Sequence, residues 1–110
     1  MINYEDFEKV DIRVGKIIEV QDFPEARKPM YKMKIDFGSE IGIKQSCGQY
    51  TQNYSKDDLM GRLVLGCVNL EPRHIGPEIS EVLTIGVEDD AGNAVLVEPE
   101  RPVKLGVRMY

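Results

Sequence analysis

The sequence predicts an all-β domain with small helical content, and three observations support this prediction. Short apolar runs that alternate with polar residues, or are rich in valine and isoleucine, recur along the chain. Glycine and proline separate these runs, and a single segment carries the start and stop signals of a helix. With 110 residues and 42% hydrophobic content, the chain is predicted to form one compact domain over residues 1–110.

The first predicted strand lies near the N-terminus. Val10–Val14 alternates apolar and polar residues, and β-branched residues continue the pattern as far as Val20. Gly15 interrupts this run and predicts a bulge or a sharp bend. The next segment, Phe23–Pro29, contains two prolines, which cannot donate to a sheet ladder, and is therefore predicted to be a loop.

The second strand is predicted over Tyr31–Phe37, which alternates strictly between the two kinds of residue. Because a strand repeats every two residues, the pattern assigns four side chains to the core (Tyr31, Met33, Ile35 and Phe37) and three to solvent (Lys32, Lys34 and Asp36). A third strand is predicted over Ile41–Cys47. The two lysines are expected to point the same way, ~7 Å apart.

A short helix is predicted over Lys56–Met60. Ser55 can act as its N-cap with Asp58 three residues later, close to a capping box, and Gly61 stands where the helix should end. The nearly continuous apolar segment Arg62–Leu70 predicts a fourth strand that is buried on both faces or lies at a dimer contact.

The remaining segments complete the predicted barrel. Glu71–Pro77 is predicted to be a loop, while Glu81–Val87 and Ala94–Val97 are predicted to be strands joined by a turn-rich connection. Five short strands with one helix between the third and fourth indicate a five-stranded Greek-key barrel of the oligonucleotide/oligosaccharide-binding (OB) type, with short terminal extensions.

Composition and motifs argue against catalysis. The only histidine, His74, and the cysteines Cys47 and Cys67 have no metal-ligand spacing, and no signature of a nucleophile and base surrounds Cys47 or His74. No phosphate-binding glycine loop occurs. The sequence therefore predicts no enzyme, no cofactor and no metal. With no signal-peptide pattern and no apolar run long enough to span a bilayer, it predicts a cytoplasmic protein without membrane insertion.

Basic residues converge on one predicted surface, although the formal net charge is -5. In OB barrels, ligands lie across the second and third strands between the loops that follow strands one and four. Six basic or titratable residues map to this surface: Arg27, Lys28, Lys32, Lys34, Arg73 and His74. The alternative, in which these are merely solvated surface side chains, stays open. Tyr50 and Tyr54 could add stacking surfaces or belong to the core.

The sequence also resembles the tRNA-binding domain family along nearly its whole length. The segments that carry the resemblance are Asp11–Gly15, Phe23–Arg27, Ile35–Gly38, Ile41–Ser46, Asn69–Arg73 and Ser80–Leu83. Family members that are appendages of synthetases often read Ser-x-Gly-Met where this chain reads Ser80–Leu83, which favours the stand-alone bacterial and archaeal subgroup and adds Ser80 to the candidate site. Gly76-Pro77 also departs from the family, which usually has glycine at the proline position.

The resemblance implies an OB barrel that forms a homodimer through its terminal extensions. It implies a protein-export-related chaperone that binds unfolded or presecretory polypeptides, with tRNA binding as the alternative function and no enzymatic activity. The extensions here are residues 1–9 and 100–110, and apolar residues alternate in the second one, from Val103 to Tyr110. We expect this tail to pack across a partner subunit; the alternative is a sixth strand on its own barrel.

Overall fold

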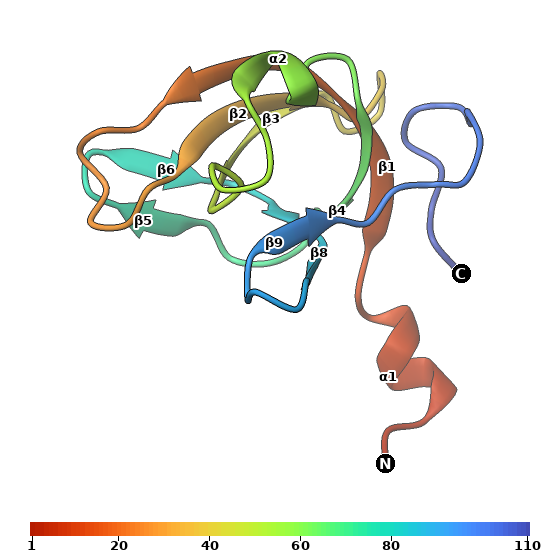
Figure 1. Cartoon of the computed structure of the whole chain (residues 1–110). Coiled ribbons are helices and arrows are strands. Elements are labelled where there is room, and N and C mark those ends of the chain that lie inside the picture. Colours follow the sequence, from red (N-terminus) through yellow and green to blue (C-terminus); the bar gives the residue numbers. More distant parts are fainter.

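The computed structural model describes residues 1–110 as a barrel-like antiparallel sheet with two added hairpins (Figure 1). Its elements are α1 (Tyr4–Glu8), β1 (Ile12–Asp22), β2 (Tyr31–Asp36), β3 (Ile43–Gly48), α2 (Lys56–Leu59), β4 (Leu63–Cys67), β5 (Arg73–Ile75), β6 (Glu78–Ser80), β7 (Leu83–Thr84), β8 (Gly86–Glu88) and β9 (Ala94–Leu96). The five-stranded sheet has the order β3-β2-β1-β4-β7, and β5-β6 and β8-β9 form separate pairs. The predicted all-β barrel is confirmed.

Strand β1 is long because it pairs with two different neighbours. Its first half pairs with β4 and its second half with β2. The prediction of an irregularity at Gly15 is wrong, since the shift in register falls between Ile17 and Glu19. Gly15 is instead required by core packing. A Cβ at this position would lie 2.8 Å from the Phe37 ring, so any larger residue would clash with the ring.

The predicted faces of β2 are confirmed. The side chains of Tyr31, Met33 and Ile35 are buried in the core cluster, where Phe37, Leu59 and Val64 join them. Lys32 and Lys34 lie on the opposite face, but both are half-buried, which corrects the expectation of fully solvated lysines.

The segment that follows β6 closes the barrel between β3 and β4. The Gln45 carbonyl on the edge of β3 accepts the Glu81 N–H at 2.8 Å, and three residues later Thr84 pairs with Gly66 of β4. At this seam the buried hydroxyls of Ser46 and Thr84 lie 2.7 Å apart. A few residues of chain therefore pair with part of both edges of the sheet, which would otherwise expose unpaired backbone groups.

Both helices begin with a capping box. In α2, the Ser55 hydroxyl accepts the Asp58 N–H at 3.1 Å and the Asp58 carboxylate accepts the Ser55 N–H at 2.9 Å, as predicted. Helix α1 was not predicted, although Asn3 and Asp6 form the same reciprocal pair. That spacing is the sequence signal that could have found α1.

The segment predicted as a loop after β4 is a hairpin, so that prediction is wrong. Gly76-Pro77 forms its two-residue turn, with φ +56° at Gly76 and proline at the second central position. Glycine first in a two-residue turn is typical of the type II′ turns that join twisted strands. The prediction of a single strand over Glu81–Val87 is also wrong. This segment contains two strands, β7, which pairs with β4, and β8, which pairs with β9, and Ile85 lies between them.

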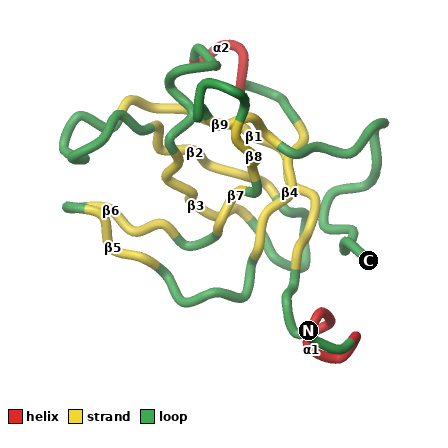
Figure 2. Tube along the Cα trace, turned by 60° about the horizontal axis from the view of Figure 1, so that its bottom comes forward, coloured by secondary structure: helices red, strands yellow, loops and turns green.

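The C-terminal tail lies against β1 of its own barrel. The Val107 carbonyl accepts the Val14 N–H at 3.0 Å, and the Met109 N–H donates to the Ile12 carbonyl at 2.8 Å. The tail therefore forms backbone hydrogen bonds with its own barrel, as in the alternative prediction of a sixth strand. Figures 1 and 2 both place the two chain ends on the side of the barrel opposite the β5–β6 hairpin.

Candidate ligand-binding surface

The β5–β6 hairpin stands on β3 and is anchored there by one glutamine. The Gln45 side-chain amide donates to the Ile79 carbonyl at 2.9 Å and to Glu78 Oε1 at 3.2 Å. The backbone N–H of Gln45 donates to Glu81 Oε1 at 3.0 Å. These bonds hold the hairpin at the edge of the β2–β3 face, where ligands were predicted to lie.

The tip of the hairpin meets the loop between β1 and β2 (Figure 1). A Cβ placed on Gly76 would lie 3.7 Å from the Glu25 carbonyl oxygen. Arg27 and Lys28 are exposed on this loop, and His74 is exposed on β5. The structure therefore brings the two predicted flanking segments together.

Lys32 and Lys34 differ in their partners, although the sequence pattern treats them alike. Lys32 Nζ lies 3.8 Å from Glu78 Oε1 and 5.6 Å from the centre of the Phe23 ring. Lys34 makes no ion pair and lines an open depression of about 620 Å³ together with Gln45 and His74. Lys34 is thus free to meet a ligand anion, while Lys32 is already neutralised.

Arg73 connects two neighbouring depressions. It lines a groove of about 530 Å³ with Leu83 and Val87, and a smaller cavity of about 150 Å³ with Leu70 and Leu83. The guanidinium makes no ion pair within the structure. A single cation therefore adjoins apolar side chains on both sides, an arrangement that suits ligands carrying both charge and apolar groups.

The Cys47 thiol lies beneath the predicted cations. Burial raises the pKa of Cys47 and Glu78 raises it further, while Lys32, Arg73 and Lys34 act in the opposite direction. Three of the predicted site residues are therefore close enough to act on one buried atom. The raised pKa keeps the thiol protonated at neutral pH, so this group is a poor nucleophile.

Ser80 builds the surface from within. Its side chain is buried, and its hydroxyl accepts the Cys47 N–H at 3.0 Å and donates to the Val82 carbonyl at 3.3 Å. The hydroxyl therefore uses both its acceptor and its donor in hydrogen bonds to backbone groups. Ser80 thus orders the edge of β3 against β6, whereas the six other predicted site residues present their side chains outward or half-outward.

Ion pairing separates the predicted site from the rest of the surface. Of the fourteen lysines and arginines, six make no ion pair within 4.0 Å: Lys16, Arg27, Lys28, Lys34, Arg73 and Lys104. Four of these six belong to the predicted site. The chain neutralises most of its cations internally and leaves the unpaired ones concentrated around the hairpin.

Neither tyrosine that the sequence offered for stacking is an open platform. The Tyr50 ring is buried and its hydroxyl donates to the Thr84 carbonyl at 3.3 Å, and burial raises the pKa of Tyr50 to about 12. Tyr54 is half-buried and lies 5.3 Å beneath the Arg62 guanidinium. Both rings belong to the core and its border.

Sequence reasoning missed the groove between β3 and β8. Besides Arg73, Leu83 and Val87, its wall includes Met30 and Ala94, which come from distant parts of the chain. No three His, Cys, Asp or Glu side chains gather in a way that could hold a metal ion. Neither helix has the length and apolar character needed to span a bilayer.

Comparison with known proteins identifies the family. The model of the family described as "Putative tRNA binding domain" matches residues 12–108. The chain is 42% identical over 108 residues to methionine–tRNA ligase from Thermococcus onnurineus, and 37% identical over 109 residues to the same kind of enzyme from Nanoarchaeum equitans. These alignments cover 98% and 99% of this chain but 14% of each ligase.

Solved structures match over the full length. The CsaA chaperone protein from Picrophilus torridus is 46% identical with a TM-score of 0.94, and the alignment covers all of both chains. Chaperone CsaA from Bacillus anthracis is 38% identical with a TM-score of 0.93, covering 100% of this chain and 99% of that one. The chain therefore belongs to the tRNA-binding domain family, and its fold is that of the CsaA chaperones.

Proposed function

We propose that this chain is a non-enzymatic, homodimeric chaperone of the cytoplasm that holds unfolded or presecretory polypeptides for export. Residues 1–110 form one binding domain in this proposal, with residues 1–9 and 100–110 at the dimer interface. The proposal is supported by the likeness to two CsaA chaperones over the whole chain. The observation that carries it is the groove between β3 and β8, which is bordered by two free strand edges.

The first free edge belongs to β8. Asp89 N–H donates to the Asn93 carbonyl and Val97 N–H to the Ile85 carbonyl, so alternate residues of this hairpin exchange hydrogen bonds. In that ladder Val87 pairs with Val95, and the backbone groups of Gly86 and Glu88 point away from β9. Gly86, Val87 and Glu88 all line the groove. The outward N–H and C=O groups of Gly86 and Glu88 can pair with an extended ligand chain.

The second free edge is the end of β3. The N–H groups of Gln45 and Cys47 are taken by Glu81 and Ser80, but no hydrogen bond reaches the Cys47 carbonyl, the next group along this edge. The groove wall between the edges is apolar at Met30 and Val87. An extended polypeptide bound here gains main-chain hydrogen bonds without a strict sequence requirement, as a chaperone needs.

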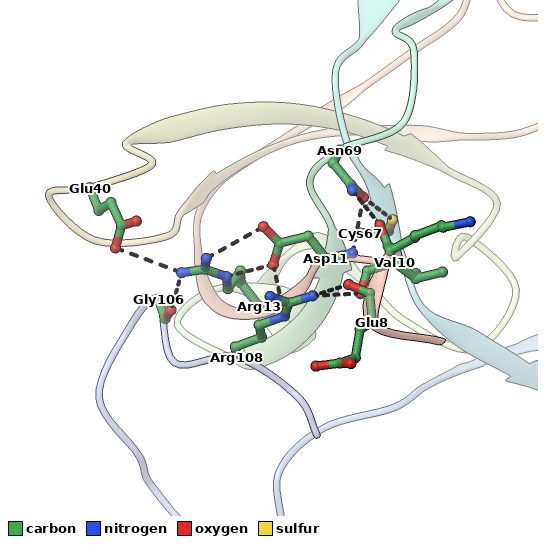
Figure 3. A network of polar contacts seen from close by, with 10 residues as sticks. Glu8, Val10, Asp11, Arg13, Glu40, Cys67, Asn69, Gly106 and Arg108 are labelled. Atoms are coloured by element: carbon green, nitrogen blue, oxygen red, sulfur yellow. Dashed lines mark hydrogen bonds and ion pairs between the residues drawn. The ribbon is translucent and has the colours of Figure 1, made fainter. Parts of the chain in front are cut away.

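Both chain ends carry the apolar surface expected of a dimer contact. Seven large apolar side chains are exposed there: Met1, Ile2, Tyr4, Val10, Val103, Val107 and Tyr110. A polar network fixes the two ends together (Figure 3). Arg108 donates to the Glu8 carbonyl and lies 3.6 Å from Asp11 Oδ1, which also accepts from Arg13 at 2.7 Å. A second subunit would cover the apolar surface and add a second groove for the same chain.

The test of the polypeptide function places a charge in the groove. We expect Val87→Asp to weaken binding of a reduced, carboxymethylated polypeptide about tenfold or more, since it desolvates a carboxylate against apolar contacts. Ile43→Asp is the matched control, because both side chains are 56% exposed and Ile43 lies outside the groove. Equal binding by the two variants in fluorescence anisotropy would contradict a ligand site at β8.

The second candidate function is tRNA binding, which the family model and the four unpaired cations favour. Neutralising four phosphates predicts that tRNA affinity falls about a hundredfold between 50 and 200 mM salt. The measurement is a titration of labelled bulk tRNA at both salt concentrations, with the unfolded polypeptide as competitor. A salt-independent affinity would remove this candidate.

A further inference from the structure

One carboxylate sits among the cations of the candidate surface. Glu78 begins β6, and its Oε1 accepts from the Gln45 side chain at 3.2 Å and lies 3.8 Å from Lys32 Nζ. The side chains of Lys32 and Glu78 are only 20% and 29% exposed. An ion pair that is partly withdrawn from water is less screened than one on an open surface.

The surroundings hold this carboxylate in place. The Gln45 amide that donates to Glu78 is itself anchored by the Ile79 carbonyl at 2.9 Å, so the donor does not have to be ordered first. On the other side, Phe23 supports the Lys32 ammonium. Both members of the pair are thus positioned by neighbours, which reduces the entropy that an exposed ion pair loses when it forms.

We infer that Glu78 determines ligand specificity. Its carboxylate pairs with Lys32, which makes this lysine less available to phosphate groups and so disfavours RNA. Polypeptide can still bind to the surface. This inference rests on the proposed function. A phosphate that approaches Lys32 must displace the Glu78 carboxylate or lie beside it, and like charges at such a distance repel. An extended peptide backbone carries no net charge and leaves the pair intact. Lys34 makes no ion pair, although Glu78 and Glu81 line the same depression, so anions meet one unpaired lysine of β2 rather than two.

The test replaces the carboxylate with its neutral isostere. Glu78→Gln keeps an oxygen that can accept from Gln45 but releases Lys32. Labelled bulk tRNA is titrated with the full chain at 50 and 200 mM salt. We expect about tenfold tighter binding at 50 mM and about threefold at 200 mM, with the salt slope steeper by about 0.9, the effect of one more phosphate contact. Affinity for the carboxymethylated polypeptide should change less than twofold.

Two controls separate this effect from net charge. Glu25→Gln makes the same change of charge on the adjacent loop, where Glu25 is exposed and has no ion-pair partner. The double variant Lys32→Gln/Glu78→Gln removes the released cation. Thermal melts confirm that each variant folds. An equal gain from Glu25→Gln, a gain that persists without Lys32, or no gain at all overturns the inference.

The outcomes also distinguish this inference from the proposed function. If the polypeptide binds but Glu78→Gln gains no RNA affinity, the inference fails and the chaperone proposal stands. If no variant binds polypeptide while Glu78→Gln shows a gain in RNA affinity that needs Lys32, the chaperone proposal fails. The role of Glu78 as a barrier to polyanions is then supported.

Discussion

The hydroxyls of Ser46 and Thr84 lie 2.7 Å apart in the buried seam where β3 meets β7. The two residues are thirty-eight positions apart in the chain. One of the two hydroxyls donates to the other, and both residues are buried. The seam also borders the groove, because both residues line it. Closure of the barrel and the shape of the ligand site therefore depend on the same contact.

This contact predicts non-additive stability changes. Ser46→Ala or Thr84→Val alone leaves one buried hydroxyl without a partner and should lower the free energy of unfolding by about 1–3 kcal/mol. The double variant Ser46→Ala/Thr84→Val removes both polar groups and should cost clearly less than the sum of the single changes. Urea denaturation of the four proteins measures this coupling; strict additivity would contradict it.

Charge reversal on β2 should separate the two lysines. Lys34→Glu is expected to leave stability nearly unchanged, because Lys34 has no ion-pair partner. Lys32→Glu places a second carboxylate beside half-buried Glu78 and should lower the free energy of unfolding by about 1–3 kcal/mol. Denaturant midpoints provide the measurement, with Lys16→Glu, another unpaired lysine, as the reference for net charge. Equal losses of unfolding free energy from Lys32→Glu and Lys34→Glu would mean that the contact between Lys32 and Glu78 does not contribute to stability.

Tyr50 predicts a loss of stability in alkali. Its pKa is raised to about 12 by burial, above the ordinary value of 10, so the folded state favours the neutral phenol. This contribution is fully present below pH 10 and is lost as the pH rises from 10 to 12, with a slope of up to about 1.4 kcal/mol per pH unit. Tyr50→Phe should flatten the stability profile in that window. A Tyr50→Phe profile parallel to the unsubstituted protein would show that Tyr50 titrates normally.

The proposed dimer interface can be tested without disturbing the fold. Tyr4 and Tyr110 are 67% and 102% exposed, so Tyr4→Asp/Tyr110→Asp should leave the thermal melt of the subunit unchanged. Sedimentation equilibrium is expected to show a dimer dissociation constant raised at least about a hundredfold, since two apolar contacts are lost. Ile79→Asp is the control, because Ile79 is exposed on the β5–β6 hairpin, on the side of the barrel opposite the two chain ends.

Truncation after Pro102 provides a second test of the proposed interface. It removes the residues that pair with β1, so the shortened chain should be less stable as well as monomeric. A truncated chain that is still dimeric by sedimentation would remove the tail from the interface.

Local patterns predicted the elements whose cause is local. The alternation in Tyr31–Phe37 correctly separated the core and outer faces of β2, and Ser55 with Asp58 correctly located α2. Strict period-two burial and a capping box each involve residues within a few positions of one another, so the sequence shows them directly. The hairpin at Gly76-Pro77 was missed because its strands are three residues long and it has too few residues for a period to show.

The sequence by itself determined the all-β class, the core residues of β2, the α2 helix and the family. Periodicity, capping pairs and motif segments each involve residues that are close together in the sequence. Only the tertiary structure decided that Lys32 is held by Glu78 while Lys34 is free, that Ser80 serves the backbone, and that β3 and β8 enclose a groove. These features depend on which residues, distant in the sequence, come close enough for hydrogen bonds or ion pairs when the barrel closes. The spacing of residues along the chain does not reveal these distances in space.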